Sequence, residues 1–234
     1  MKLHELRDLL KTYENQLPSE LKLELNEKLK ESVEAYPFNE YEFRITYLRE
    51  HQVLTFSEYE NIRRTYILSN KYLELYGLAP RVFGQIWGEA NIRELNSKFN
   101  KASKSLDKYY SGEYDLWIGG KKIEVKACRA IDKNIRGSLT SKALEFDSTK
   151  TFWMNFQQLK FDICDIFIFI GVWTDVIKYW VLSNDEIKTN PYISHQHRGG
   201  VEYQIGITEK NISQFDDYLV EPKNLAEFIL SKTE

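Results

Sequence analysis

The sequence has few cysteines and no apolar run long enough to span a membrane. Its two cysteines, Cys128 and Cys164, are too few for a disulfide framework and suit a reducing cytoplasm. We expect both to be small buried thiols on strands. The longest apolar run, from Ile163 to Trp173, is interrupted by Asp165 and falls short of the ~20 residues of a membrane span. Acidic residues near the start, such as Glu5, argue against a signal peptide. The sequence therefore predicts a cytoplasmic protein without membrane contact.

The chain also lacks a strong net charge, an internal repeat and a low-complexity linker. Its formal net charge of −3 argues against a surface that is basic throughout. The hydrophobic content of 42% and the aromatic content of 14% are typical of a folded globular protein. Basic residues concentrate between Lys98 and Lys142, where eleven Lys or Arg accompany five acids. From Met1 to Ala35, eight acids outnumber six basic residues, so positive potential is expected in the middle of the chain.

The segment from Tyr114 to Cys128 carries the most specific signal. It places a Gly119-Gly120 pair between two short β-type runs, the pattern of a hairpin with a two-residue turn. Counting outward from the turn pairs Asp115 with Glu124, and strand period two puts Lys126 on the same face. The opposite face collects the apolar side chains and is expected to be buried: Leu116, Ile118, Ile123, Val125 and Ala127.

Two carboxylates opposed across a hairpin repel each other and destabilise the ladder. A bound cation relieves this repulsion. Mg²⁺ takes oxygen ligands, often one or two carboxylates together with substrate phosphates. Lys126 beside them would orient a water or balance charge that develops on a phosphate. The alternative is a surface hairpin of mixed charge, in which Lys126 only neutralises Glu124.

Asp115 followed by Glu124-Val125-Lys126 on the next strand resembles the core of the PD-(D/E)XK nuclease superfamily, especially the type II restriction endonucleases. Tyr114 stands where the family has proline, at a position that varies widely. The resemblance implies an α/β (α+β) fold, a restriction-endonuclease-like core with a central mixed sheet flanked by helices. It also implies that Asp115 and Glu124 are catalytic residues that hold Mg²⁺. Lys126 would be the catalytic residue that positions or helps to deprotonate the attacking water.

The resemblance implies an acidic helix upstream of the hairpin, and residues Pro80 to Leu95 are a candidate. Proline opens this segment, its apolar residues follow a helical period, and Glu89 lies beside the apolar stripe. Similar G-x-x-x-E helices in the superfamily supply a further metal-site carboxylate. Glu89 is therefore a further candidate catalytic and metal-binding residue, and the alternative is an ordinary residue at the helix boundary.

We expect two regions, with a boundary near Gly77–Pro80 where Gly and Pro interrupt the pattern. Residues 1–79 would form a helical region with possible dimer or DNA contacts, and residues 80–234 the catalytic core with DNA-recognition loops. Leucine spacing and Pro18 predict two helices at the start. Further helices are expected over Asn39–Gln52, Ser57–Tyr76, Trp153–Lys160 (capped by Ser148 or Thr149) and near Asn224–Leu230. Strands are expected over Asp165–Trp173, Ile177–Leu182 and Val201–Thr208.

Base readout in the major groove uses Arg or Lys for guanine and Asn or Gln for adenine. Two polar segments qualify, Arg129–Lys150 and Thr189–Gly200. His195 and His197 are not expected to bind zinc, because no further Cys or His cluster completes such a site. The candidate DNA-binding residues are Arg129, Lys133, Arg136, Lys142, Gln196 and Arg198, of which Lys133, Arg136 and Lys142 suit phosphates better than bases. A plain surface loop is the alternative for the second segment.

These features lead to the hypothesis of a Mg²⁺-dependent type II restriction endonuclease that acts on double-stranded DNA. By the resemblance, the products would carry 5′-phosphate and 3′-hydroxyl ends. Cutting both strands of a palindrome suits a homodimer, and a companion DNA methyltransferase would protect the host genome. Two alternatives stay open: a repair or recombination nuclease of the same fold, and a DNA-binding module without catalysis, which the intact Asp, Glu and Lys set disfavours.

Overall fold

Helices dominate one part of the chain and strands dominate the other. In this computed structural model, which describes residues 1–33, 35–195 and 202–232, the protein has a mixed α+β architecture. The chain divides into two compact units. The first contains Met1–Ala79, Ile131–Thr151 and Trp173–Val176, and the second contains Pro80–Ala130, Phe152–Val172 and Ile177–Glu234. All of the predicted helical region 1–79 lies in the first unit, but two later segments belong to that unit as well.

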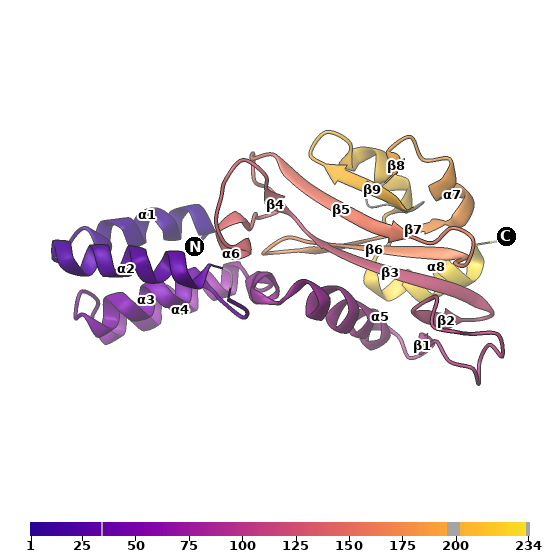
Figure 1. Cartoon of the computed structure of the whole chain (residues 1–234), viewed down its shortest axis with the longest axis horizontal. Coiled ribbons are helices and arrows are strands. Elements are labelled where there is room, and N and C mark those ends of the chain that lie inside the picture. The colour runs from indigo at the N-terminus through magenta and orange to yellow at the C-terminus, as the bar shows by residue number, and fades with distance from the viewer. Residues whose placement is uncertain (34, 196–201, 233–234) are drawn as a thin grey trace. The chain divides into compact units, whose positions relative to one another are not determined.

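The first unit is built mainly from helices, drawn in indigo and purple in Figure 1. Its elements are α1 (Leu3–Glu14), α2 (Ser19–Ser32), α3 (Glu40–Glu50), α4 (Phe56–Ser69), the 3₁₀ helix η1 (Leu73–Gly77), β4 (Ile131–Asp132) and α6 (Leu139–Lys142). The leucine stripe that predicts α1 is buried, since Leu3, Leu6 and Leu10 are at most 2% exposed. Among the described residues, no helix is both long and apolar enough to cross a membrane.

The predicted helix over Ser57–Tyr76 is two shorter helices. α4 begins with a capping box in which the Thr55 hydroxyl accepts from the backbone N–H of Glu58, whose carboxylate accepts from the backbone N–H of Thr55. It ends at Ser69, and the side-chain oxygen of the C-cap residue Asn70 accepts a hydrogen bond of 2.8 Å from the Thr174 hydroxyl. This contact spans a large distance in sequence, and it helps to explain why residues 173–176 belong to the first unit.

The second unit centres on a five-stranded mixed sheet. Its strands, in spatial order, are β1 (Asn100–Lys101), β2 (Leu116–Ile118), β3 (Lys121–Arg129), β6 (Ile166–Val172) and β7 (Ile177–Ser183). β3 and β6 run parallel, and the other neighbours are antiparallel. All residues of β6 are buried, as expected of a strand covered on both faces. The strands predicted over Asp165–Trp173 and Ile177–Leu182 are confirmed.

The hairpin of β2 and β3 has the register that the sequence predicts. Leu116 pairs with Ile123, Trp117 with Lys122, and Ile118 with Lys121. Gly119 and Gly120 have φ angles of +55° and +92°, as a type I′ turn requires at both central positions. Asp115 lies one residue before β2, where its backbone N–H donates to the Ile123 carbonyl at 2.9 Å.

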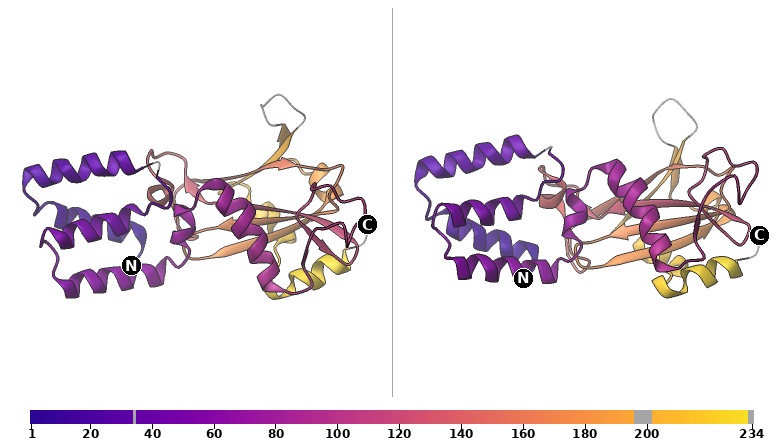
Figure 2. Two further views of the ribbon diagram at one scale, coloured as in Figure 1. Left: turned by 60° about the horizontal axis from the view of Figure 1, so that its bottom comes forward. Right: turned by 90° about the horizontal axis from the view of Figure 1, so that it is seen from below.

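Helices cover one face of the five-stranded sheet (Figure 2). The π-helical segment η2 (Val82–Gly88) continues directly into α5 (Glu89–Leu95), and α8 (Leu225–Ser231) lies on the same side of the sheet. The predicted helix over Pro80–Leu95 is therefore present, as is the C-terminal one. Gly88 allows the helix to approach β3 closely, because a Cβ atom at Gly88 would lie 3.3 Å from the Cβ of Ala127.

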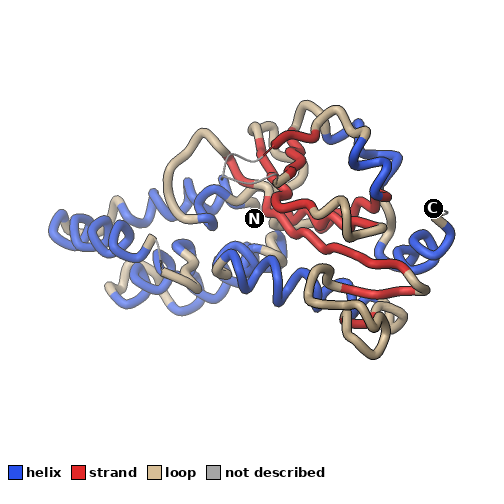
Figure 3. Tube along the Cα trace, turned by 45° about the vertical axis from the view of Figure 1, so that its right-hand side comes forward, coloured by secondary structure: helices blue, strands red, loops and turns tan. Residues whose placement is uncertain are grey.

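A second sheet covers the opposite face (Figure 3). In it, β9 (Tyr203–Thr208) pairs antiparallel with both β5 (Phe152–Leu159) and β8 (Ile193–His195). The ring of Phe156 on β5 stacks on that of Phe169 on β6, with centroids 4.6 Å apart. Within the described residues, short helices complete the unit: α7 (Asn184–Lys188), η3 (Ile212–Tyr218) and η4 (Pro222–Asn224).

The helix predicted over Trp153–Lys160 is wrong, because residues 152–159 form β5. Phe152, Met154 and Phe156 are buried, whereas Trp153 between them is 44% exposed, which is the period of a strand. A capping residue upstream favours a helix only locally, and pairing with β9 outweighs it. In the connection between the parallel strands β3 and β6, a strand of a second sheet therefore stands in place of the helix predicted over Trp153–Lys160.

Gly171 on β6 offers a test of the packing between the two sheets. A Cβ atom there would lie 2.6 Å from a ring carbon of Trp180 and 3.2 Å from the sulfur of Met154. Because the site is closely packed, we expect Gly171→Ala to lower the free energy of unfolding by about 1–3 kcal/mol, measured by urea denaturation. The control is Gly206→Ala on β9, where the nearest atom is 3.4 Å away. Equal losses in the two variants would contradict the close packing.

Candidate active site

The four predicted catalytic residues line one hollow of about 350 Å³ in the second unit. Glu89 comes from the start of α5, Asp115 from the residue before β2, and Glu124 and Lys126 from β3. Polar side chains of β5 form another part of the wall: Asn155, Gln157 and Gln158. We call this space the Glu124 hollow. The hairpin face that the sequence predicts as charged therefore borders a hollow that is walled by the second sheet.

The carboxylate of Glu124 is almost completely buried, at 1% exposed. Its Oε1 atom lies 2.9 Å from Nζ of Lys126 and 3.5 Å from Nζ of Lys160. Oε2 accepts a hydrogen bond of 3.2 Å from the backbone N–H of Lys160. Within the described residues, Oε1 accepts no hydrogen bond in addition to these ion pairs. One buried oxygen therefore faces two ammonium groups and keeps capacity for another partner.

Asp115 is fixed by its neighbour on the hairpin. Its Oδ2 atom accepts a hydrogen bond of 2.8 Å from the backbone N–H of Val125. Burial raises the pKa of Asp115 and the charge of Glu124 acts in the same direction, while the Val125 hydrogen bond and Lys126 oppose the rise. The ionised form of Asp115 is therefore disfavoured in the folded protein, and a cation in the hollow would relieve that cost.

Glu89 is the first residue after the π-helical segment. Such segments are frequent at functional sites, and here the segment ends at Gly88, which packs on β3. Burial raises the pKa of Glu89, and the charge of Asp115 raises it further, while Lys101 and Arg93 lower it. Glu89 therefore lies within the electrostatic reach of Asp115 on the wall of the hollow.

Lys160 is a charged residue of the site that the sequence did not reveal. Its Nζ donates to the backbone carbonyl of Glu113 at 2.7 Å and lies 3.5 Å from Glu124. A β-bulge at the end of β5 precedes it, where Gln158 has a φ angle of +59° and the register with β9 shifts. Bulges often re-aim side chains next to functional sites. In the sequence, Lys160 is only the last residue of a segment, Trp153–Lys160, whose pattern predicts a helix.

The residues present fit a hard divalent cation bound by two carboxylates. Asp115 and Glu124 offer oxygen atoms, and Glu124 Oε1 is buried with spare acceptor capacity. Such donor sets suit Mg²⁺, which usually keeps several waters and takes substrate phosphates as further ligands. Among the described residues, no group of three or more His, Cys, Asp or Glu is arranged to hold a metal ion. The additional ligand role predicted for Glu89 therefore gains no support.

The two cysteines are free thiols. Cys164 is buried just before β6, and its Sγ lies 3.8 Å from Glu124 Oε2, to which it donates. Cys128 is half-buried on β3, and burial raises its pKa to about 11. Both thiols are therefore protonated at neutral pH, as expected of structural cysteines.

The predicted DNA contacts are spread over the chain. Lys133, Arg136 and Lys142 belong to the first unit, and the first two are exposed. Arg129, at the end of β3 in the second unit, is 7% exposed, and its guanidinium lies 3.8 Å from the ring centroid of Phe83. This burial against an aromatic ring disfavours the DNA contact predicted for Arg129.

The predicted recognition loop is only partly described. Gln196, His197 and Arg198 lie outside the described residues. His195 ends β8, is exposed, and lies against the ring of Tyr203 at a centroid distance of 4.7 Å. Base contacts by Gln196 and Arg198 therefore stay predictions.

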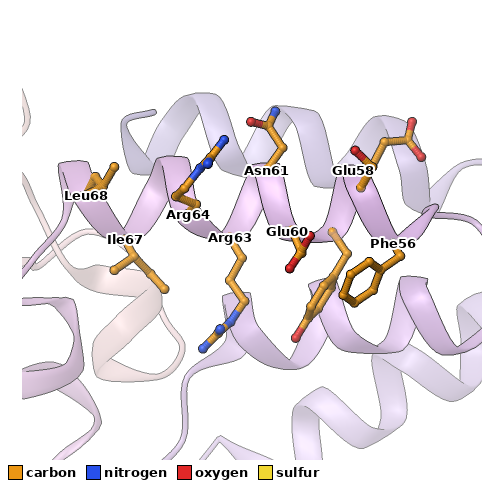
Figure 4. A pocket seen from close by; sticks show the side chains of 10 residues that line it. Phe56, Glu58, Glu60, Asn61, Arg63, Arg64, Ile67 and Leu68 are labelled. Carbon is orange, nitrogen blue, oxygen red and sulfur yellow. The ribbon is translucent and has the colours of Figure 1, made fainter.

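The first unit has a hollow of its own along α4, of about 660 Å³. Figure 4 shows its lining, in which Arg63 and Ile67 point to one side of the helix and Arg64 points to the other. Phe56 and Leu68 on this helix are 59% and 76% exposed. Carboxylates occur here too, but the buried pairing of carboxylate and ammonium that marks the Glu124 hollow does not.

A scan against protein-family models and a search of curated proteins find no match to this chain. The Glu124 hollow therefore provides the main indication of function. It contains the buried carboxylate of Glu124 and a second carboxylate, Asp115, whose pKa is raised. The ammonium groups of Lys126 and Lys160 lie beside Glu124.

Asp115→Asn should stabilise the fold at neutral pH. The folded-state pKa of Asp115 is raised, so its ionisation costs stability as the pH rises from about 4 through the folded pKa. Asn keeps an acceptor for the Val125 N–H and carries no charge. We expect a gain of about 0.5–2 kcal/mol at pH 7 that vanishes below about pH 4, measured by urea denaturation at several pH values.

Asp107→Asn is the matched control, because hydrogen bonding to the Tyr109 N–H lowers the pKa of Asp107. This control should give no gain at pH 7. A gain for Asp115→Asn that is as large at pH 3 as at pH 7 would show that ionisation is not its cause.

Proposed function

We propose that this protein is a Mg²⁺-dependent endodeoxyribonuclease of the PD-(D/E)XK type, most specifically a type II restriction endonuclease. The observation that carries the proposal is the convergence of Asp115, Glu124 and Lys126 on one hollow, with Glu124 1% exposed beside two ammonium groups. A surface hairpin of mixed charge has no need of a buried carboxylate. A centre for phosphodiester hydrolysis does, because it must gather carboxylates and cations around one phosphate.

The residues of the hollow have distinct parts in this proposal. Asp115 and Glu124 would hold Mg²⁺, which when bound polarises the phosphate and lowers the pKa of a coordinated water. Lys126, 20% exposed at its side chain and paired with Glu124, would orient the attacking water and balance the negative charge that develops on the phosphate. Glu89 also lines the hollow, and its negative charge would stabilise the bound cation.

The reaction proposed is hydrolysis of one phosphodiester bond. The water oxygen forms a bond to phosphorus and gives up one proton to solvent, while the bond from phosphorus to the 3′ oxygen breaks and that oxygen takes one proton from solvent. The products are a 5′-phosphate and a 3′-hydroxyl. Lys160, with a side chain 41% exposed, is well placed to meet a phosphate oxygen, because ammonium groups bind phosphate as point charges.

The substrate proposed is double-stranded DNA cut at a short defined sequence by a homodimer, with a cognate DNA methyltransferase protecting the host. Lys133, Arg136 and Lys142 are kept as candidate phosphate contacts, and Gln196 and Arg198 as candidate base contacts. A repair or recombination nuclease of the same fold would cut by DNA structure instead. A DNA-binding module would bind without cutting.

The test is incubation of the purified protein with plasmid and phage DNA in the presence of Mg²⁺. We expect discrete fragments, and loss of cleavage by at least about 100-fold in Asp115→Asn and Lys126→Gln. Glu94→Gln is the control, because Glu94 is exposed on α5 and does not line the hollow. Fragment patterns on a gel and initial rates provide the measurement.

The outcomes separate the alternatives. Cleavage at DNA junctions or ends instead of fixed sequences would favour the repair nuclease, and binding without cleavage would favour the DNA-binding module. Undiminished cleavage by both site variants would overturn the site assignment. Because Lys126→Gln leaves a buried carboxylate with less compensation, Asp115→Asn, which is expected to be more stable than wild type, keeps the test independent of folding.

Lys160 should act on substrate binding more than on the chemical step. The side chain of Lys160 is more exposed than that of Lys126. Its ammonium group also donates a hydrogen bond to the Glu113 carbonyl, in addition to its ion pair with Glu124. We expect Lys160→Met to raise KM by about 10-fold, equivalent to ~1.4 kcal/mol, with a smaller loss of kcat. Steady-state kinetics on a cleaved plasmid measure both, and a pure loss of kcat would contradict this role.

A further inference from the structure

A second hollow adjoins the Glu124 hollow in the same unit. It has a volume of about 430 Å³, and Gln85, Glu89 and Asp115 line both spaces. These residues form a common wall. On the far side of this wall the second hollow is lined by Arg93 of α5 and Lys101 of β1, and we call it the Arg93 hollow.

The two cations of the Arg93 hollow are exposed and unpaired. Within the described residues, neither side chain forms a hydrogen bond or an ion pair shorter than 4.0 Å. Neighbouring lysines behave differently, since Lys98 pairs with Glu227 and Lys122 with Asp107. Both Arg93 and Lys101 are nevertheless close enough to Glu89 to stabilise its charge. The hollow thus combines free positive charge with a wall shared with the candidate catalytic residues.

An aromatic hydroxyl group completes this lining. Tyr110 lines the hollow, and its ring packs edge-on against Tyr114 with centroids 4.9 Å apart. Burial raises the pKa of Tyr110, so its hydroxyl stays a hydrogen-bond donor at neutral pH. Guanidinium, ammonium and hydroxyl donors facing one space form a set suited to a phosphate.

We propose that the Arg93 hollow binds a backbone phosphate of the same DNA strand that is cleaved, next to the phosphate in the Glu124 hollow. This inference rests on the proposed function. A DNA strand carries a phosphate every 3.4 Å or so of helix axis, so a strand seated at Asp115 brings further phosphates across the common wall. Arg93 and Lys101 would hold the strand against the repulsion of Glu89 and Asp115.

The test compares the double variant Arg93→Gln/Lys101→Gln with wild type. Binding of a fluorescent duplex is measured by anisotropy at several salt concentrations, in EDTA to prevent cleavage. The slope of log K against log salt changes by about 0.9 for each phosphate contact, so we expect loss of this one phosphate contact to reduce the slope by about 0.9. With Mg²⁺ and a cleaved plasmid, KM should rise by more than kcat falls.

The control double variant Lys210→Gln/Lys223→Gln removes the same charge. Both lysines are exposed in the second unit, and neither lines either hollow. A slope in the Arg93→Gln/Lys101→Gln variant equal to that of the control, in a protein that cuts DNA, would overturn the phosphate site alone. A wild-type protein that neither binds nor cuts DNA would overturn the proposed function and this inference with it.

Discussion

The buried carboxylate of Glu124 is the constraint on which the arrangement of the second unit depends. A carboxylate that is 1% exposed needs charge compensation and hydrogen bonds, because its desolvation otherwise costs several kcal/mol. Here Lys126 and Lys160 provide the charge, and the backbone of Lys160 provides a hydrogen bond. β3, which carries Glu124 and Lys126, therefore lies close to the end of β5, which Lys160 follows directly. Residues of both strands line the Glu124 hollow.

Lys160, the residue directly after β5, supplies one of the two ammonium groups beside Glu124, and a β-bulge in β5 precedes it. Gln158 adopts the left-handed conformation, and the register with β9 shifts at that point. Without the bulge the side chains that follow would point to the opposite faces, and Lys160 would lose its place beside Glu124. The positive φ angle of Gln158 is unfavourable for a residue other than glycine. Such strained residues cluster at functional sites, and this one lies in the β-bulge that precedes Lys160.

The sequence predicts the parts of the site that are local. The turn at Gly119-Gly120 fixes the register of the hairpin, which places Asp115 opposite Glu124. Strand period two then puts Lys126 on the same face as Glu124. The helix bearing Glu89 follows from its periodicity. The role of Lys160 was not predictable, because it depends on pairing between β5 and a strand far along the chain. Local capping signals favoured a helix there, and no short-range pattern reveals a bulge or its partner.

The first unit takes one of its segments, residues 173–176, from the connection between two buried strands of the second. On the ribosome, the N-terminal helices emerge early, and domains generally fold as units in the order of synthesis. This chain cannot follow that order fully, since the partner that binds Asn70 is made only after β6. The first unit can therefore complete its contacts only after β6 has been translated.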